Sequence, residues 1–120
     1  MNFWRDPFLK EKYAIKRDDL EVGAVFVCIK SVPPYNSQRP SMFTVGHEYK
    51  ILDTQYANAS NLLSNFFEFE NDEVSDWYSA NDLLNFSPHR CTGLRYSFVK
   101  KELLSEKQLF VLKMTGEFDA

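Results

Sequence analysis

Two segments that lie 23 residues apart share the pattern Val-Gly-x-x-aromatic-x-apolar-apolar, over residues 22–29 and residues 45–52. Both segments are rich in β-branched and aromatic residues and too short for a helix. In each segment the expected strand follows a glycine, Gly23 or Gly46, the residue that best permits a tight bend before a strand. The echo predicts two equivalent β-strands, although two copies are too few for a repeat protein.

Other short strands are expected along the chain. We predict strands over residues 24–30, then 42–45 and 48–53 around a Gly46 turn, followed by a hairpin of residues 66–70 and 76–80. A last pair of strands is predicted over residues 94–99 and 108–114, joined by a turn or one helical turn at residues 100–107. Loops are expected at residues 32–40, where three prolines stiffen the chain, and at residues 56–65 and 87–93.

Helical signals are few. Asp6 followed by Pro7 is a cap and first-turn pair, which predicts a helix over residues 7–16. A short helical turn is expected over residues 79–86, with Ser79 or Asn81 as its cap.

A chain of 120 residues, 44% of them hydrophobic, is long enough for one compact domain. The predicted fold class is mainly β, a small SH3-like antiparallel barrel with an N-terminal helix and a C-terminal strand pair (α+β). We expect a single domain with a helical extension at residues 1–19, a barrel core at residues 20–87 and the strand pair at residues 88–120.

The barrel is expected from a resemblance. The two glycine-led strands, the Asn71-Asp72 turn, Trp77-Tyr78 and the closing Phe86 resemble the small SH3-like barrel proteins of bacteriophages and bacteria, from Leu20 to Phe86. The flanking helix and the last strand pair have no counterpart in such barrels. The resemblance implies a phage accessory protein and transfers no functional residue.

Charge is distributed unevenly. The net charge is -3, yet residues 51–89 contain no Lys or Arg and seven acidic residues: Asp53, Glu68, Glu70, Asp72, Glu73, Asp76 and Asp82. The segments on either side each carry a net charge of +2. If the acids share a face, they attract a basic partner and repel a phosphate backbone; otherwise they form a solvated surface that only aids solubility.

The residues offer little for catalysis or cofactor binding. His89 and Cys91, even with Cys28 and His47, lack the paired spacing of a structural zinc site, so no metal is expected. Nothing marks an oxyanion hole for a Cys91 nucleophile, and the four glycines never cluster into a phosphate loop. We expect Cys28 to be buried in its strand, and Glu68 and Glu70 to point outward while Phe67 and Phe69 point inward.

The preferred hypothesis is a non-catalytic module that binds a basic surface on a host protein, with no cofactor. The resemblance to phage proteins implies that such binding inhibits the host protein. The stiff loop at residues 32–40, the acidic hairpin tip at residues 70–76 and the aromatic pair Trp77-Tyr78 would combine an apolar anchor with a charged rim. Alternation allows only one of the aromatic pair to be exposed. The candidate partner-binding residues are Tyr35, Glu70, Asp72, Glu73, Asp76, Trp77 and Tyr78.

Nucleic-acid binding is the alternative. Aromatic side chains (Tyr35, Tyr56, Trp77, Tyr78 and Tyr96) could stack on bases beside the cations Arg39, Arg90, Arg95, Lys100 and Lys101. The location expected is the cytoplasm, that of the host if the gene belongs to a phage, because the N-terminus shows no secretory signal and no apolar run could span a membrane.

Overall fold

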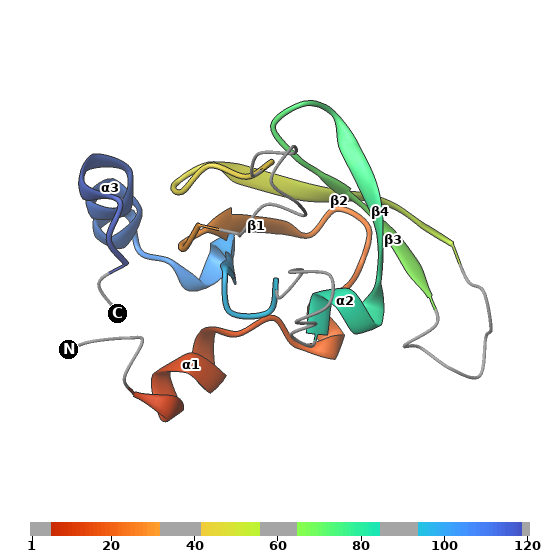
Figure 1. Cartoon of the computed structure of the whole chain (residues 1–120). Helices are drawn as coiled ribbons and strands as arrows, with labels where there is room; N and C mark the ends of the chain where they lie inside the picture. Colours follow the sequence, from red (N-terminus) through yellow and green to blue (C-terminus); the bar gives the residue numbers. More distant parts are fainter. Residues whose placement is uncertain (1–5, 32–41, 56–64, 85–93, 119–120) are drawn as a thin grey trace.

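A five-stranded antiparallel sheet organises the protein (Figure 1). The computed structural model describes residues 6–31, 42–55, 65–84 and 94–118. The strand order is β4-β3-β2-β1-β5. The strands are β1 (Val25–Cys28), β2 (Glu48–Gln55), β3 (Phe66–Glu70), β4 (Ser75–Ser79) and β5 (Phe98–Lys100). The expected α+β class is therefore confirmed, while no pairing joins β4 to β5 among the described residues.

The two segments of the sequence echo form neighbouring strands related by an approximate two-fold axis. Phe26 of β1 pairs with Tyr49 of β2, its counterpart in the echo. Gly23 and Gly46 both have positive φ, of 93° and 90°. The Gly23 amide donates to the Ile51 carbonyl at 2.8 Å, and the Gly46 amide donates to the Cys28 carbonyl at the same distance. The predicted glycine entry into both strands is confirmed.

One face of the sheet carries an aromatic core. Phe26, Tyr49, Phe69 and Phe98, from four different strands, are buried in one cluster, in which Phe43 contacts Tyr49, Phe69 and Phe98, and Phe26 contacts Phe69. Their rings meet mostly edge to face, for example Phe43 and Phe98 at 5.0 Å between centroids, an arrangement that aromatic quadrupoles favour. Helix α2 (Ala80–Leu84) closes this core from the end of β4, capped by Ser79, whose hydroxyl accepts from the Asp82 amide at 3.1 Å. Ser79 is thus one of the two caps expected.

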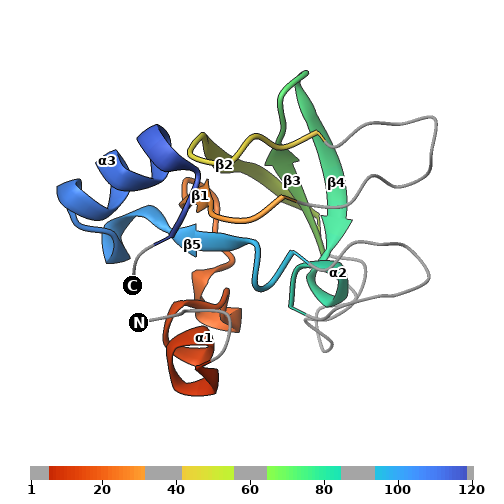
Figure 2. The ribbon, with the colours of Figure 1, turned by 60° about the vertical axis from the view of Figure 1, so that its left-hand side comes forward.

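Among the described residues, helices cover the other face over β1 and β5. Helices α1 (Pro7–Tyr13) and α3 (Glu106–Thr115) supply Tyr13 and Leu112, which are buried against Val27 and Val99. Figure 2 shows α3 beside β1 and β5, away from β3 and β4. Because β1 is covered on both faces, its side chains are apolar on both, which explains the continuous apolar run of residues 24–29.

Helix α1 begins where the sequence predicts. The Asp6 carboxylate accepts hydrogen bonds from the amides of Phe8 and Leu9, at 2.9 and 3.3 Å. The helix ends at Tyr13 rather than at residue 16, and a 3-10 turn follows (η2, Arg17–Asp19). Ile15 then packs in the aromatic core and its amide donates to the Arg95 carbonyl at 3.1 Å.

The expected C-terminal strand pair is wrong. Residues 108–114 lie within α3, because Ser105 and Gln108 form a reciprocal capping box and Gly116 ends the helix in the left-handed conformation. The strand predicted at residues 94–99 is reduced to β5, followed by a 3-10 turn (η4, Lys101–Leu103). Residues 42–45 form no strand; they pack on the core through Phe43. The remaining predicted strands are found with boundaries shifted by a few residues.

Candidate functional site

The half of the sheet that α3 leaves uncovered carries a mixed apolar and acidic surface. Pairing across β2, β3 and β4 places Asp53 opposite Glu68 and Glu68 opposite Trp77, so the three side chains form one row. A bulge in β2 between Ile51 and Asp53 adds Leu52 to the same side. We call this surface the acidic face, made of Leu52, Asp53, Phe66, Glu68, Glu70 and Trp77.

The apolar members of the acidic face are large and accessible. Leu52 and Phe66 are each 40% exposed and Trp77 is 45% exposed. Phe66 lies two residues from Glu68 along β3, diagonal to Trp77. These three large apolar side chains come from three adjacent strands and lie on one side of the sheet, and large apolar side chains gathered on one face of a small protein are typical of an interaction surface.

Trp77 is the exposed member of the aromatic pair. Its neighbour Tyr78 lies on the opposite face, opposite Phe67, and packs against the aromatic core. Phe67 and Phe69 are buried, and Glu68 and Glu70 point to the other side, as the alternation predicts. Tyr78 therefore contributes to the core, and Trp77 is the aromatic side chain available to a partner.

The hairpin tip between β3 and β4 is rigidly built. The Asn71 side-chain oxygen accepts from the amides of Glu73 and Val74 at 3.0 and 2.9 Å, closing an Asx turn. Glu73 and Asp76 are exposed, and their side chains form no hydrogen bond or ion pair with any other described residue. These two carboxylates are free to meet a cation.

Asp72 has a different role from its neighbours. Its carboxylate accepts from the Tyr49 hydroxyl at 2.6 Å and from the Thr44 hydroxyl at 2.8 Å, and its amide donates to the Met42 carbonyl. Burial, and after it the hydrogen bond to Asp72, raises the pKa of Tyr49. Asp72 therefore fastens the hairpin tip to residues 42–44, and its carboxylate already accepts two hydrogen bonds within the protein.

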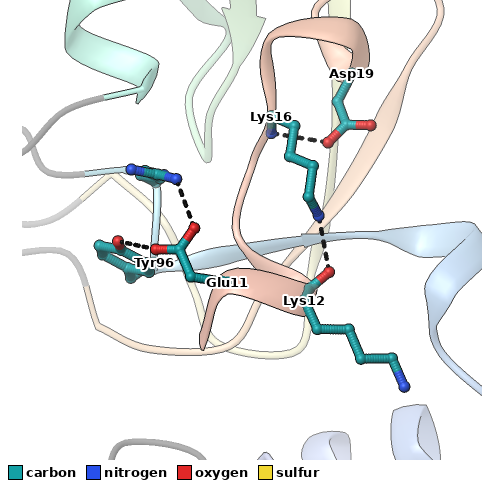
Figure 3. Close-up of polar contacts among 6 residues, drawn as sticks. Glu11, Lys12, Lys16, Asp19 and Tyr96 are labelled. Carbon is teal, nitrogen blue, oxygen red and sulfur yellow. Dashed lines mark hydrogen bonds and ion pairs between the residues drawn. The ribbon is translucent and has the colours of Figure 1, made fainter. Parts of the chain in front are cut away.

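Nucleic-acid binding would depend on basic side chains, and the described candidates, Arg95, Lys100 and Lys101, are each paired with an acid. Arg95 contacts Glu11 at 2.9 Å, and Glu11 also accepts from the Tyr96 hydroxyl at 2.9 Å (Figure 3). Lys100 lies 3.1 Å from Glu102 and 3.7 Å from Asp19, and Lys101 lies 2.8 Å from Glu48. The Tyr96 ring is approached by Lys10 and Arg95, at 6.0 and 5.2 Å from its centroid. These contacts reduce the positive field that a phosphate backbone needs.

Several predicted site residues lie outside the described residues: Tyr35, Tyr56, Arg39, Arg90, His89 and Cys91. Cys28 is fully buried, its thiol donates to the Lys30 carbonyl at 3.3 Å, and burial raises its pKa to about 11. Within the described ranges, no three His, Cys, Asp or Glu side chains are grouped so that they could hold a metal ion.

Four members of the acidic face were not named as site residues from the sequence: Leu52, Asp53, Phe66 and Glu68. The alternation of residues 66–70 already indicates that Phe66 shares a face with Glu68. Leu52 and Asp53 could not be assigned in this way, because the bulge places two consecutive residues on one side. Lys50 lies on the same side of β2, so this side also carries a base.

Comparison with protein-family models, curated proteins and solved structures yields no match to this chain. None of the described helices has the length and apolarity needed to cross a membrane.

Proposed function

We propose that this protein is a non-catalytic binding module whose acidic face engages a basic surface on another protein. The observation that carries the proposal is the row of Asp53, Glu68 and Trp77 across three strands, with Leu52 and Phe66 beside it. A large apolar anchor bordered by charges supplies affinity from the anchor and association rate from the charges.

Charge favours a protein partner over a nucleic acid. Glu73 and Asp76 extend the negative potential beyond the acidic face, while Arg95, Lys100 and Lys101 have acidic partners. A phosphate backbone would meet repulsion at the exposed aromatic surface, whereas Lys and Arg side chains would meet attraction and could also lie over the Trp77 indole.

The proposal includes the small SH3-like barrel as the fold type. Two features support it: the last strand returns beside the first, and the bulge in β2 bends the sheet, a usual means of curling a sheet toward closure. By the same resemblance, the partner is expected to be a protein of a bacterial host, held or inhibited by a phage accessory protein.

The test is a pull-down from nuclease-treated bacterial lysate with wild-type protein and with Trp77→Ala. We expect Trp77→Ala to lose a partner that the wild type retains, because truncating a central aromatic anchor typically costs an interface about 2 kcal/mol or more. Phe110→Ala is the matched control, since Phe110 is an exposed aromatic residue, 64% accessible, on α3 rather than on the acidic face.

If Trp77→Ala and Phe110→Ala both capture every protein that the wild type captures, the acidic face is not the binding surface. Material that the wild type captures from untreated lysate and loses entirely after nuclease treatment would favour the nucleic-acid alternative instead.

A further inference from the structure

The outer strand of the sheet, β4, has backbone groups that no described residue uses. The Ala80 amide donates to the Asn65 carbonyl at 2.9 Å and the Asn71 amide donates to the Val74 carbonyl at 3.3 Å, at the two ends of the β3–β4 ladder. Hydrogen-bonded pairs alternate along an antiparallel ladder, so Asp76 and Tyr78 also bond to β3. The amides of Ser75, Trp77 and Ser79 and the carbonyls of Ser75 and Trp77 therefore point away from β3, whereas the Ser79 carbonyl accepts the first hydrogen bond of α2.

The opposite edge of the sheet differs. β5 has three residues and passes directly into the 3-10 turn η4. The carbonyl of Arg95, shortly before β5, already accepts the Ile15 amide. This edge is short and flanked by other segments, which is one of the ordinary ways in which proteins protect a sheet edge.

β4 contains few of those protective devices. Its sequence, Ser-Asp-Trp-Tyr-Ser, has no proline, no lysine and no glycine, and it pairs with β3 without a register shift. An unprotected edge is a template on which an extended segment can add as a further strand.

The charges around β4 indicate what kind of segment fits. Asp76 lies in the strand, Glu73 precedes it, and Glu68 lies on the next strand opposite Trp77. A second copy of this edge would bring two sets of the same acids together, which is unfavourable. A segment with Lys or Arg at alternate positions would instead place its cations beside Trp77 and the acidic face.

Building on the proposed function, we propose that β4 binds an extended basic segment of the partner protein as a sixth strand. Backbone hydrogen bonds to Ser75, Trp77 and Ser79 hold the segment. Its alternate side chains lie over the acidic face, which selects for Lys and Arg. The proposal rests on the acidic face being the binding surface and adds the mode of binding.

A peptide pair tests the mode without altering the protein. The probe is an acetylated, amidated heptapeptide that alternates valine and lysine, and the control is the same peptide with every internal amide N-methylated. We expect the probe to bind and the methylated peptide to bind at least about fivefold more weakly, the effect of losing one ordinary hydrogen bond. In hydrogen-exchange NMR, the amides of Ser75, Trp77 and Ser79 should become protected only with the unmethylated probe.

A variant pair tests the same mode from the protein side. Ser75→Pro removes an outward amide and leaves the β3 ladder intact, whereas Ser75→Ala removes only the hydroxyl that donates to Glu68 at 2.8 Å. We expect Ser75→Pro to bind the probe at least about fivefold more weakly than Ser75→Ala does. Amide spectra of both variants establish that they are folded.

The outcomes separate the two proposals. Equal binding of both peptides, abolished by Trp77→Ala, would overturn strand addition and leave the acidic face as the binding surface. Failure of both peptides to bind, together with a Trp77→Ala pull-down identical to wild type, would overturn both.

Discussion

Burial in the core strongly changes the acidity of the Cys28 thiol. Desolvation raises its thiol pKa to about 11 from the ordinary value of 9.0, while the hydrogen bond to the Lys30 carbonyl acts in the opposite direction. The thiol therefore stays protonated at neutral pH and behaves as a small apolar group, not as a nucleophile.

This shift predicts a loss of stability in alkali. Because the folded pKa is raised, the contribution of Cys28 is fully present below about pH 9 and is lost as the pH rises toward 11. Urea unfolding of wild type and Cys28→Ala across this range should show a steeper decline for wild type. Tyr49 has a raised pKa in both proteins, so the difference between them isolates Cys28. Parallel declines would contradict the assignment.

The positive φ of Gly23 and Gly46, the glycines before β1 and β2, predicts a second effect of single residues. Gly23→Ala and Gly46→Ala should each destabilise the fold by about 1 kcal/mol, the strain of placing a side chain in a left-handed conformation. Gly46→Ala should cost more, because its Cβ would lie 3.3 Å from the Lys113 side chain, whereas the space at Gly23 is open. Thermal unfolding measures both, and a stabilised Gly46→Ala variant would contradict this expectation.

Among the elements, α3 depends on its caps. The Ser105 hydroxyl accepts from the Gln108 amide at 3.1 Å, and the Gln108 side chain accepts from the Ser105 amide at 2.9 Å. Ser105→Ala should destabilise the protein by about 1 kcal/mol and Ser105→Gly by only a few tenths. Chemical denaturation compares the two, and equal effects would mean that α3 is held by packing alone.

The tip of the β3–β4 hairpin predicts a contrast between adjacent acids. Asp72→Ala should cost about 1–3 kcal/mol, since the buried Tyr49 hydroxyl loses its acceptor. Glu73→Ala should stay within about 0.5 kcal/mol of wild type, because the Glu73 carboxylate bonds to no other described residue. Denaturant midpoints measure both. Asp72 therefore belongs in a test of stability, and Glu73 and Asp76 belong in a test of binding.

Elements with two agreeing local signals were predictable from the sequence. The Asp6-Pro7 cap gave the start of α1, and alternation gave the β3–β4 hairpin and the inward Phe67 and Phe69. The strand predicted at residues 108–114 was wrong because an apolar run cannot by itself distinguish a strand from a helix. The signals that settle it, Ser105 with Gln108 and then Gly116, lie at its two ends.

Across the whole molecule, the sequence located the acids but not the partners of the bases. Arg95, Lys100 and Lys101 contact Glu11, Asp19 and Glu48, respectively. These partners lie 84, 81 and 53 residues away in the chain. Such pairs depend on the fold bringing the termini beside β1, and nothing local in the sequence indicates them. The acidic segment, by contrast, contains no base between residues 51 and 89, so no acid in it can pair with a base close by in the chain.

The uneven charge predicts how binding responds to salt. Reversing Glu73 and Asp76 to Lys should slow association with a basic partner and flatten its dependence on ionic strength, with a smaller effect on dissociation. Association rates at low and physiological salt measure this, and reversal of Lys107 and Lys113 on α3 to Glu is the control. A salt dependence unchanged by the first pair would mean that these acids take no part in steering.

The reciprocal glycine contacts between β1 and β2 have a consequence for how the sheet finds its alignment. Most strands are aligned by having one apolar and one polar face, but β1 is apolar on both, so a slip of one residue would still bury apolar side chains. The Gly23–Ile51 and Gly46–Cys28 hydrogen bonds lie at opposite ends of this strand pair. Any slip breaks both at once, so two backbone contacts provide the unique register that the side chains of β1 leave undetermined.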